Sequence, residues 1–141
     1  MPSANLDLVR SIYAAWERGD YSAAEWADPE IEYVIADGPS PGTSTGPTGM
    51  ADRLRDFLNA WEGVRLVAEV YRELDNERIL VLNRLTARGK TSGLEGGQVR
   101  GEGAYLFYTR GGAVIRLVAY MDRGRALADL GLAPEGGSPD S

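Results

Sequence analysis

Apolar residues recur at intervals of three and four along two segments in the first half of the chain, which is the spacing of one helix face. The first segment spans 5–18 and has Asn5 as a candidate N-cap. The second spans 49–62, and a capping-box spacing predicts a shorter helix between them at 22–26. The apolar stripes of the two longer helices are Leu6, Val9, Ile12, Tyr13 and Trp16, and Met50, Leu54, Phe57, Leu58 and Trp61.

Strands are predicted where apolar and polar residues alternate. One strand is predicted at 30–36, and four more form a meander in the second half of the chain. These four are predicted at 64–74, 78–88, 98–109 and 113–121. Prolines and glycines make 37–48 a loop, and Asp122 can cap a last helix over 123–130.

Two short turns set the registers of the meander. A two-residue loop at Asp75-Asn76 places Val70 opposite Val81, Ala68 opposite Asn83 and Leu66 opposite Leu85. A two-residue loop at Arg110-Gly111 places Leu106 opposite Ile115, Ala104 opposite Leu117 and Glu102 opposite Ala119. One sheet face then collects Leu66, Ala68, Val70, Val81, Asn83, Leu85, Ala87, Arg100, Glu102, Ala104, Leu106, Ile115, Leu117, Ala119 and Met121. Because this face is almost entirely apolar, we expect it to pack on the helices.

The length of 141 residues is that of a single domain. Helices followed by a strand meander indicate an α+β domain over residues 1–132 with a curved antiparallel sheet. Three helices from the N-terminal half are expected to close this sheet, with a short C-terminal helix after it. Residues 133–141 are rich in Pro, Gly and Ser, and are expected to form a disordered tail.

Composition narrows the chemistry. The chain has no His and no Cys, so it has no Ser-His or Cys-His nucleophile and none of the ligands that zinc favours. We expect no metal and no other cofactor. A net charge of −6 argues against nucleic acid and anionic membranes as partners. No apolar run reaches membrane-spanning length and no signal pattern opens the chain, so we expect a cytoplasmic protein.

Three local motifs are similar to those of a known fold family. They are Trp16-Glu-Arg-Gly-Asp20, Trp26-Ala-Asp-Pro-Glu-Ile-Glu-Tyr33, and Tyr120-Met-Asp122 followed by Ala126-Leu-Ala-Asp-Leu-Gly-Leu132. With the order of elements, they resemble the nuclear transport factor 2-like fold, especially its SnoaL-like polyketide-cyclase and ketosteroid-isomerase-like branch. The resemblance implies a cone-shaped sheet around an interior pocket.

The positions that carry chemistry in such proteins hold aliphatic residues in this chain. The groups of the ketosteroid isomerases match Ile12, Val34 or Ile35, and Ala104, whereas those of the limonene epoxide hydrolases match Leu85, Ala87 and Ala119. The scytalone dehydratases use histidines, which are absent here. The resemblance therefore implies a pocket and argues against these three reactions.

Glu102 is the main catalytic candidate, because the predicted pairing surrounds its carboxylate with apolar side chains. Burial would raise its pKa and suit it to proton transfer. Arg100, two residues earlier, is the expected countercharge. The alternative is a solvated ion pair at a strand end. Asp37 is a further catalytic candidate at the pocket mouth, or merely a turn residue.

The expected ligand-binding residues lie on the same wall. They are Tyr13, Trp16, Tyr33, Trp61, Asn83, Leu85, Ala104, Leu117, Ala119 and Met121. Among them, the Asn83 amide can bind a ligand carbonyl or satisfy a buried backbone group. The aromatic rings can contact a ligand or simply fill the core.

The opposite sheet face is also predicted to be apolar. It holds Val67, Tyr71, Leu82, Tyr105, Phe107, Val118 and Tyr120. This surface predicts a homodimer, which the resemblance also implies, unless terminal segments of the chain cover it.

For function, the sequence predicts binding of a small apolar molecule, cyclic or polyketide-like. With turnover, the reaction would be a cofactor-independent isomerisation, cyclisation or dehydration by proton transfer. The alternatives are a non-catalytic carrier or sensor, and a dimerisation domain whose interior is filled. A cavity of roughly 300 Å³ or more separates the first two from the third.

Overall fold

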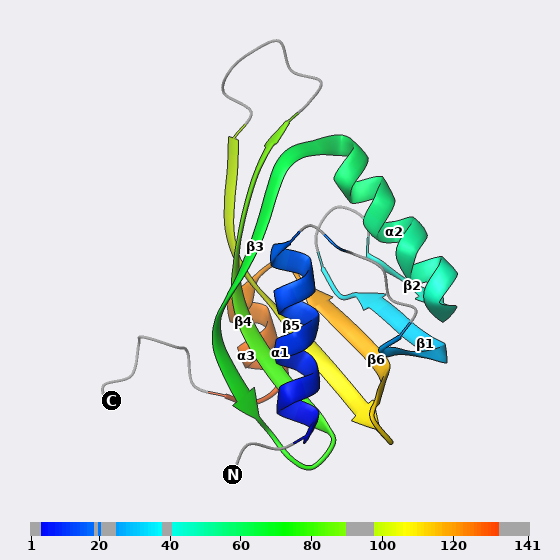
Figure 1. Cartoon of the computed structure of the whole chain (residues 1–141). Helices are drawn as coiled ribbons and strands as arrows, with labels where there is room; N and C mark the ends of the chain where they lie inside the picture. The colour runs from blue at the N-terminus through cyan, green and yellow to red at the C-terminus, as the bar shows by residue number, and fades with distance from the viewer. Residues whose placement is uncertain (1–3, 19, 21–24, 38–40, 90–97, 133–141) are drawn as a thin grey trace.

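Figure 1 shows the computed structural model, which describes residues 4–18, 20, 25–37, 41–89 and 98–132, without the side chains of 57–62, 88–89 and 98–100. The elements in chain order are α1 (Ala4–Glu17), β1 (Ala27–Ile35), β2 (Gly42–Thr45), α2 (Gly46–Ala60), β3 (Trp61–Glu73), β4 (Arg78–Gly89), β5 (Gln98–Arg110), β6 (Ala113–Tyr120) and α3 (Arg123–Asp129). Most of the predicted short helix at 22–26 and the predicted tail at 133–141 lie outside these residues.

The six strands in the described part of the chain form one mixed sheet, in the order β2-β1-β6-β5-β4-β3. β1 runs parallel to β6, whereas every other neighbouring pair is antiparallel. The α+β class and the curved sheet are therefore confirmed, but the sheet is not wholly antiparallel. The predicted loop at 37–48 also contains β2, because its extended Thr and Ser residues hydrogen-bond along β1.

The sheet has helices on both sides. α1 and α2 lie on its concave side, and α3 lies behind it (Figure 1). The predicted stripe of α1 is buried through Val9, Ile12, Tyr13 and Trp16 against the concave side. The two sides have separate apolar cores, and burial in both stabilises the curved sheet.

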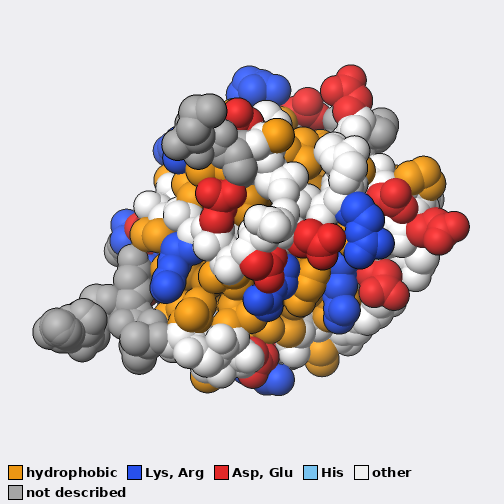
Figure 2. Space-filling model, turned by 90° about the horizontal axis from the view of Figure 1, so that it is seen from below, with side chains coloured by type: hydrophobic (Ala, Val, Ile, Leu, Met, Phe, Trp, Pro, Cys, Tyr) orange, Lys and Arg blue, Asp and Glu red, His pale blue; other side chains and the backbone are white. Residues whose placement is uncertain are grey.

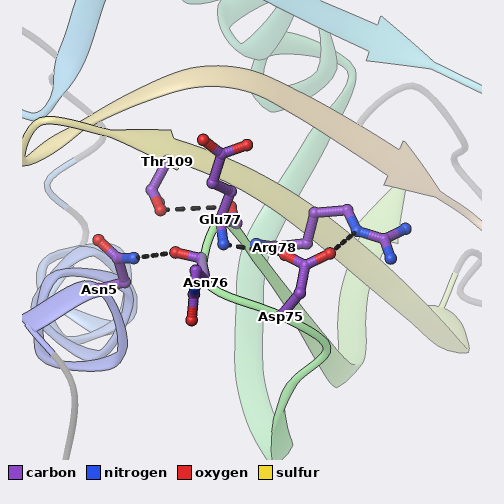
Figure 3. Close-up of polar contacts among 6 residues, drawn as sticks. All are labelled: Asn5, Asp75, Asn76, Glu77, Arg78 and Thr109. Atoms are coloured by element: carbon purple, nitrogen blue, oxygen red, sulfur yellow. Dashed lines mark hydrogen bonds and ion pairs between the residues drawn. The ribbon is translucent and has the colours of Figure 1, made fainter.

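The turn between β3 and β4 contains three residues, not the two predicted (Figure 3). The Leu74 N–H donates to the Arg78 carbonyl at 2.9 Å, which leaves Asp75, Asn76 and Glu77 in the loop. Asp75 Oδ1 accepts the N–H groups of Glu77 at 2.9 Å and Arg78 at 2.8 Å. These hydrogen bonds, with the Arg78 guanidinium, hold the pKa of the Asp75 carboxyl below its usual value. The carboxylate thus stabilises the longer loop.

The same turn fastens α1 and β5 (Figure 3). Asn5 Nδ2 donates to the Asn76 carbonyl at 2.7 Å. Thr109 donates to the Glu77 carbonyl through its backbone N–H at 2.7 Å and its hydroxyl at 3.2 Å. Asn5 is therefore not the predicted cap: α1 begins at Ala4, and the amide joins the helix to the hairpin.

A bulge at Glu69 compensates for the extra loop residue. The predicted partners of Leu66 and Ala68 are confirmed, but the pairing of Val70 with Val81 is wrong. The observed pairs are Leu66 with Leu85, Ala68 with Asn83, Val70 with Leu82 and Tyr71 with Val81. Beyond the bulge, Tyr71 packs with the concave core and Val70 with the other one.

The turn between β5 and β6 is formed by Gly111 and Gly112, whose φ angles are +61° and +83°. A hairpin turn of this kind needs positive φ at both central positions, which disfavours the predicted loop with Arg110. A second bulge, at Ile115, shifts the pairing once more. The observed pairs are Ala104 with Tyr120, Tyr105 with Ala119, Leu106 with Val118 and Phe107 with Leu117.

The predicted pairs for β5 are therefore wrong, and every side chain of the strand changes face. Tyr105 and Phe107 pack with the concave core, whereas Ala104 and Leu106 pack in the other core with Leu127 of α3. α3 is itself confirmed, with the Asp122 side chain accepting the Gly124 N–H at 3.0 Å.

The apolar face predicted for a dimer is consequently not an exposed surface. Tyr71, Tyr105 and Phe107 belong to the concave side, and the residues shared with α3 are Leu82, Val118 and Tyr120. Val67 remains 38% exposed. From below, the apolar surface is divided by acidic and basic side chains (Figure 2).

Gly103 lies where β5 closely approaches the end of β6. A Cβ atom at this position would be 2.5 Å from the Tyr120 carbonyl oxygen and 3.4 Å from Asn83 Oδ1. Since the nearest atom belongs to the backbone, a larger residue would displace the strand. Gly101 on the same strand has no atom within 4 Å of such a Cβ.

We predict that Gly103→Ala lowers the free energy of unfolding by about 1–3 kcal/mol, the usual cost of overpacking. Gly101→Ala should be neutral or stabilising by up to about 1 kcal/mol. Urea denaturation at pH 7 measures both. Equal destabilisation by the two substitutions would contradict the close approach at Gly103.

Candidate functional site

A cavity of about 280 Å³ lies on the concave side of the sheet. Its lining comes from five strands, from α2 and from the residue after β6. The lining residues are Tyr33, Ile35, Arg53, Leu54, Val64, Leu66, Asn83, Leu85, Gly101, Gly103, Ala104, Tyr105, Ala119, Tyr120 and Met121. The volume lies just below the threshold of roughly 300 Å³ for ligand pockets.

Small residues in the lining leave room for the cavity. Gly101 and Gly103 lack side chains, and Ala119 has a short one. Larger apolar side chains, such as Leu54 and Leu66, form the walls. The lining is therefore mainly apolar, with a few polar groups that can orient a ligand.

One polar pair is formed by Tyr33 of β1 and Tyr105 of β5. Burial raises the pKa of Tyr33, although a side-chain hydrogen bond with Tyr105 and the positive charge of Arg53 offset part of this effect. Tyr33 is therefore a neutral phenol at pH 7. Its hydroxyl can donate a hydrogen bond to a ligand oxygen.

A second polar pair lies between the cavity and α1. Asn83 lines the cavity and is 3% exposed, and its Nδ2 donates to the Tyr13 hydroxyl at 2.9 Å. Burial raises the pKa of Tyr13 well above its usual value, and the bond from Asn83 offsets only part of this rise. The Asn83 amide thus satisfies a buried side-chain hydroxyl, whereas the sequence predicted a ligand group or a backbone group as its partner. Asn83 also lines the cavity.

Arg53 supplies charge at the α2 side of the cavity. It is half-buried, and its Nη2 is 3.7 Å from the position that a Cβ atom would take at Gly42 of β2. Among the lining residues that the structure describes, Arg53 alone carries a formal charge. The cavity is therefore apolar with one cationic end.

The predicted placement of Glu102 in this cavity is wrong. Because of the bulge at Ile115, Glu102 lies opposite Arg84 on the other sheet face. Its side chain is 59% exposed and lies 3.9 Å from the Arg84 guanidinium. An exposed pair of this kind corresponds to the solvated alternative. The Arg100 side chain lies outside the described residues.

Asp37 joins the ends of two strands. Its carboxylate accepts the backbone N–H groups of Met121 at 2.6 Å and Asp122 at 3.3 Å. It is not among the residues that line the cavity. The observed contacts correspond to a structural role at the exit of β1.

Six of the ten predicted ligand-binding residues line the cavity: Tyr33, Asn83, Leu85, Ala104, Ala119 and Met121. Tyr13, Trp16 and Leu117 are instead buried in the adjoining core. The ring centroids of Tyr13 and Trp16 are 5.0 Å apart in an edge-to-face contact, so these rings fill the core. The Trp61 side chain lies outside the described residues.

Sequence reasoning missed Arg53 and Tyr105. Arg53 had a detectable signal, because it lies three residues after Met50 and interrupts the apolar stripe of α2. No sequence signal indicated Tyr105, because the sheet face that its side chain occupies depends on the bulge at Ile115.

In the described part of the chain, no helix has the length and apolar character needed to cross a membrane. The acidic side chains of this part form no group of three or more that could hold a metal ion.

Comparison with solved structures shows the fold. A nuclear transport factor 2-like protein of unknown function from Burkholderia pseudomallei matches with a TM-score of 0.72 and 22% identity, over 89% of this chain and 96% of that one. TerC, co-crystallised with polyporic acid, matches with a TM-score of 0.70 and 21% identity, over 91% and 98%. A hypothetical protein with a ketosteroid isomerase-like fold from Catenulispora acidiphila, in complex with trimethylamine, matches with a TM-score of 0.67 and 17% identity, over 90% and 94%.

Other matching structures are described as SnoaL-like polyketide cyclases. The predicted resemblance is therefore confirmed at the level of the fold. No protein-family model and no curated protein sequence matches the chain.

The burial of Tyr13 predicts a loss of stability at alkaline pH, because burial raises the pKa of its hydroxyl in the folded chain. The unfolded chain releases the Tyr13 proton above about pH 10, whereas the folded chain keeps it. The free energy of unfolding should therefore decrease as pH rises above this value. Tyr13→Phe should lower stability at pH 7 by about 1–3 kcal/mol, since Asn83 loses its acceptor.

The variant should also lose stability less steeply between pH 10 and pH 11 than the wild type. Urea denaturation across this range measures both slopes. Parallel slopes would show that Tyr13 ionises equally in the folded and unfolded chains.

Proposed function

We propose that this nuclear transport factor 2-like domain binds a small, cyclic or polyketide-like molecule in the concave cavity. The observation that carries the proposal is the mainly apolar lining, with Tyr33, Asn83 and Arg53 as its polar groups. Apolar walls supply affinity through burial, and a few placed polar groups orient the ligand. Two structural relatives hold small molecules, polyporic acid in one and trimethylamine in the other, so this fold accommodates ligands of unlike chemistry.

The lining favours a protein that binds its ligand without converting it. The described residues around the cavity include no Asp or Glu to accept a proton. The raised pKa of Tyr33 makes this residue a hydrogen-bond donor and not a base. A proton-transfer isomerase, cyclase or dehydratase is the alternative, and it would need a base from outside this set. A ligand carrier or sensor needs no catalytic base.

A two-fold dimer stays a prediction that follows from the resemblance alone. The apolar residues that motivated it lie in the two cores, as described above.

We predict that Leu66→Trp blocks binding, because the indole would occupy the cavity. The matched control is Val67→Trp on the next residue, which is 38% exposed and lies opposite Arg84 on the other sheet face. Isothermal titration calorimetry with 2-naphthol at pH 7 should give a dissociation constant below about 1 mM for the wild type. The heat-capacity change should be negative, as expected for apolar burial.

Leu66→Trp should weaken this binding at least about tenfold, while Val67→Trp leaves it unchanged. Circular dichroism should show both variants folded. Equal binding by wild type and Leu66→Trp would place the probe elsewhere on the protein. No binding by the wild type would contradict the proposed function for ligands of this size.

A further inference from the structure

We propose that the ligand of the cavity carries an anionic oxygen group, such as a carboxylate or an acidic enol, which Arg53 holds at the α2 side. This inference rests on the proposed function, since it names the ligand class of the same cavity. The proposal also gives the ligand an orientation, with its apolar rings against the strands and its anionic group against α2.

The charge distribution around the cavity is the first observation that supports an anion. Among the described lining residues, Arg53 is the sole one with a formal charge, and no Asp or Glu lies beside it in that lining. The chain as a whole carries a net charge of −6, which repels anions at long range. Arg53 therefore places a cationic group in this lining, in contrast to the negative net charge of the chain.

The position of the guanidinium is the second observation. Arg53 Nη2 is 3.7 Å from the position that a Cβ atom would take at Gly42, which pairs with Ile35 of β1. Ile35 lines the cavity, as does Tyr33 two residues earlier on the same strand, and the positive charge of Arg53 lowers the pKa of the Tyr33 hydroxyl. The arginine and the phenol therefore face the same part of the site. Together they offer donors to one ligand oxygen group from α2 and from β1.

The chemistry of the two donors suits an oxyanion. A guanidinium has five N–H donors in a planar fork, so it can bind both oxygens of a carboxylate while keeping contacts to the protein. The neutral Tyr33 hydroxyl can add one donor. A mainly apolar lining strengthens such charge-assisted hydrogen bonds, because little water competes for them. The same charge repels an amine of equal size.

Three naphthalene probes test this assignment. They are 2-naphthoate, 2-naphthamide and 2-naphthylmethylamine, which are an anion, a neutral amide and a cation at pH 7 with the same ring system. Calorimetry on the full chain measures their affinities. We expect wild-type protein to bind the anion at least about tenfold more tightly than the amide, and the amine most weakly.

Arg53→Gln should remove the preference for the anion and leave binding of the amide within about threefold of wild type. The control is Arg55→Gln on the same helix. Arg55 is 63% exposed, pairs with Asp52 at 2.8 Å and does not line the cavity, so its substitution should preserve the preference. Circular dichroism verifies that both variants fold.

The outcomes separate the two proposals. If the wild type binds the anion and the amide equally, or if Arg53→Gln keeps the preference, the anionic ligand class is wrong while the cavity still binds small molecules. If none of the three probes binds, the proposed function itself fails for ligands of this size. A loss of preference in Arg53→Gln alone supports the assignment.

Discussion

Strand register determines which side chains surround the cavity, and bulges in β3 and β6 help to set that register. Glu69 in β3 and Ile115 in β6 each add one residue without a partner. Since side chains alternate between the faces of a strand, one extra residue exchanges the faces beyond it. Tyr105 therefore enters the cavity, and Glu102 lies on the opposite face. The chemical character of the site follows from these two positions.

The polar groups around the cavity are compatible with an apolar interior because they are satisfied in pairs. A buried hydroxyl or amide without a partner would cost about 1–3 kcal/mol. Asn83 donates to Tyr13, and Tyr105 is hydrogen-bonded to Tyr33, so each of these bonds links elements distant in the sequence. Burial keeps both acceptor phenols neutral at pH 7. The described lining thus presents phenol and amide groups and one guanidinium, and no carboxylate, to a ligand.

Much of the fold was predictable from the sequence, because helix stripes and strand alternation report burial directly. The stripe ending at Trp16 and the cap at Asp122 are confirmed in this way. The site was less predictable, since a face assignment fails when one bulge lies between a turn and the residue of interest. The glycine pair that forms the β5–β6 turn was visible, but the bulge at Ile115 has no local signature. Glu102 was misplaced for this reason.

A crystal structure of the protein with 2-naphthoate would test the central claim, which is an apolar cavity with a cationic end, most directly. The naphthalene ring should lie between Leu66 and Ala119, and the carboxylate should lie about 3 Å from the Arg53 guanidinium. A ring bound outside the concave side, or a cavity filled by the protein's own side chains, would contradict it.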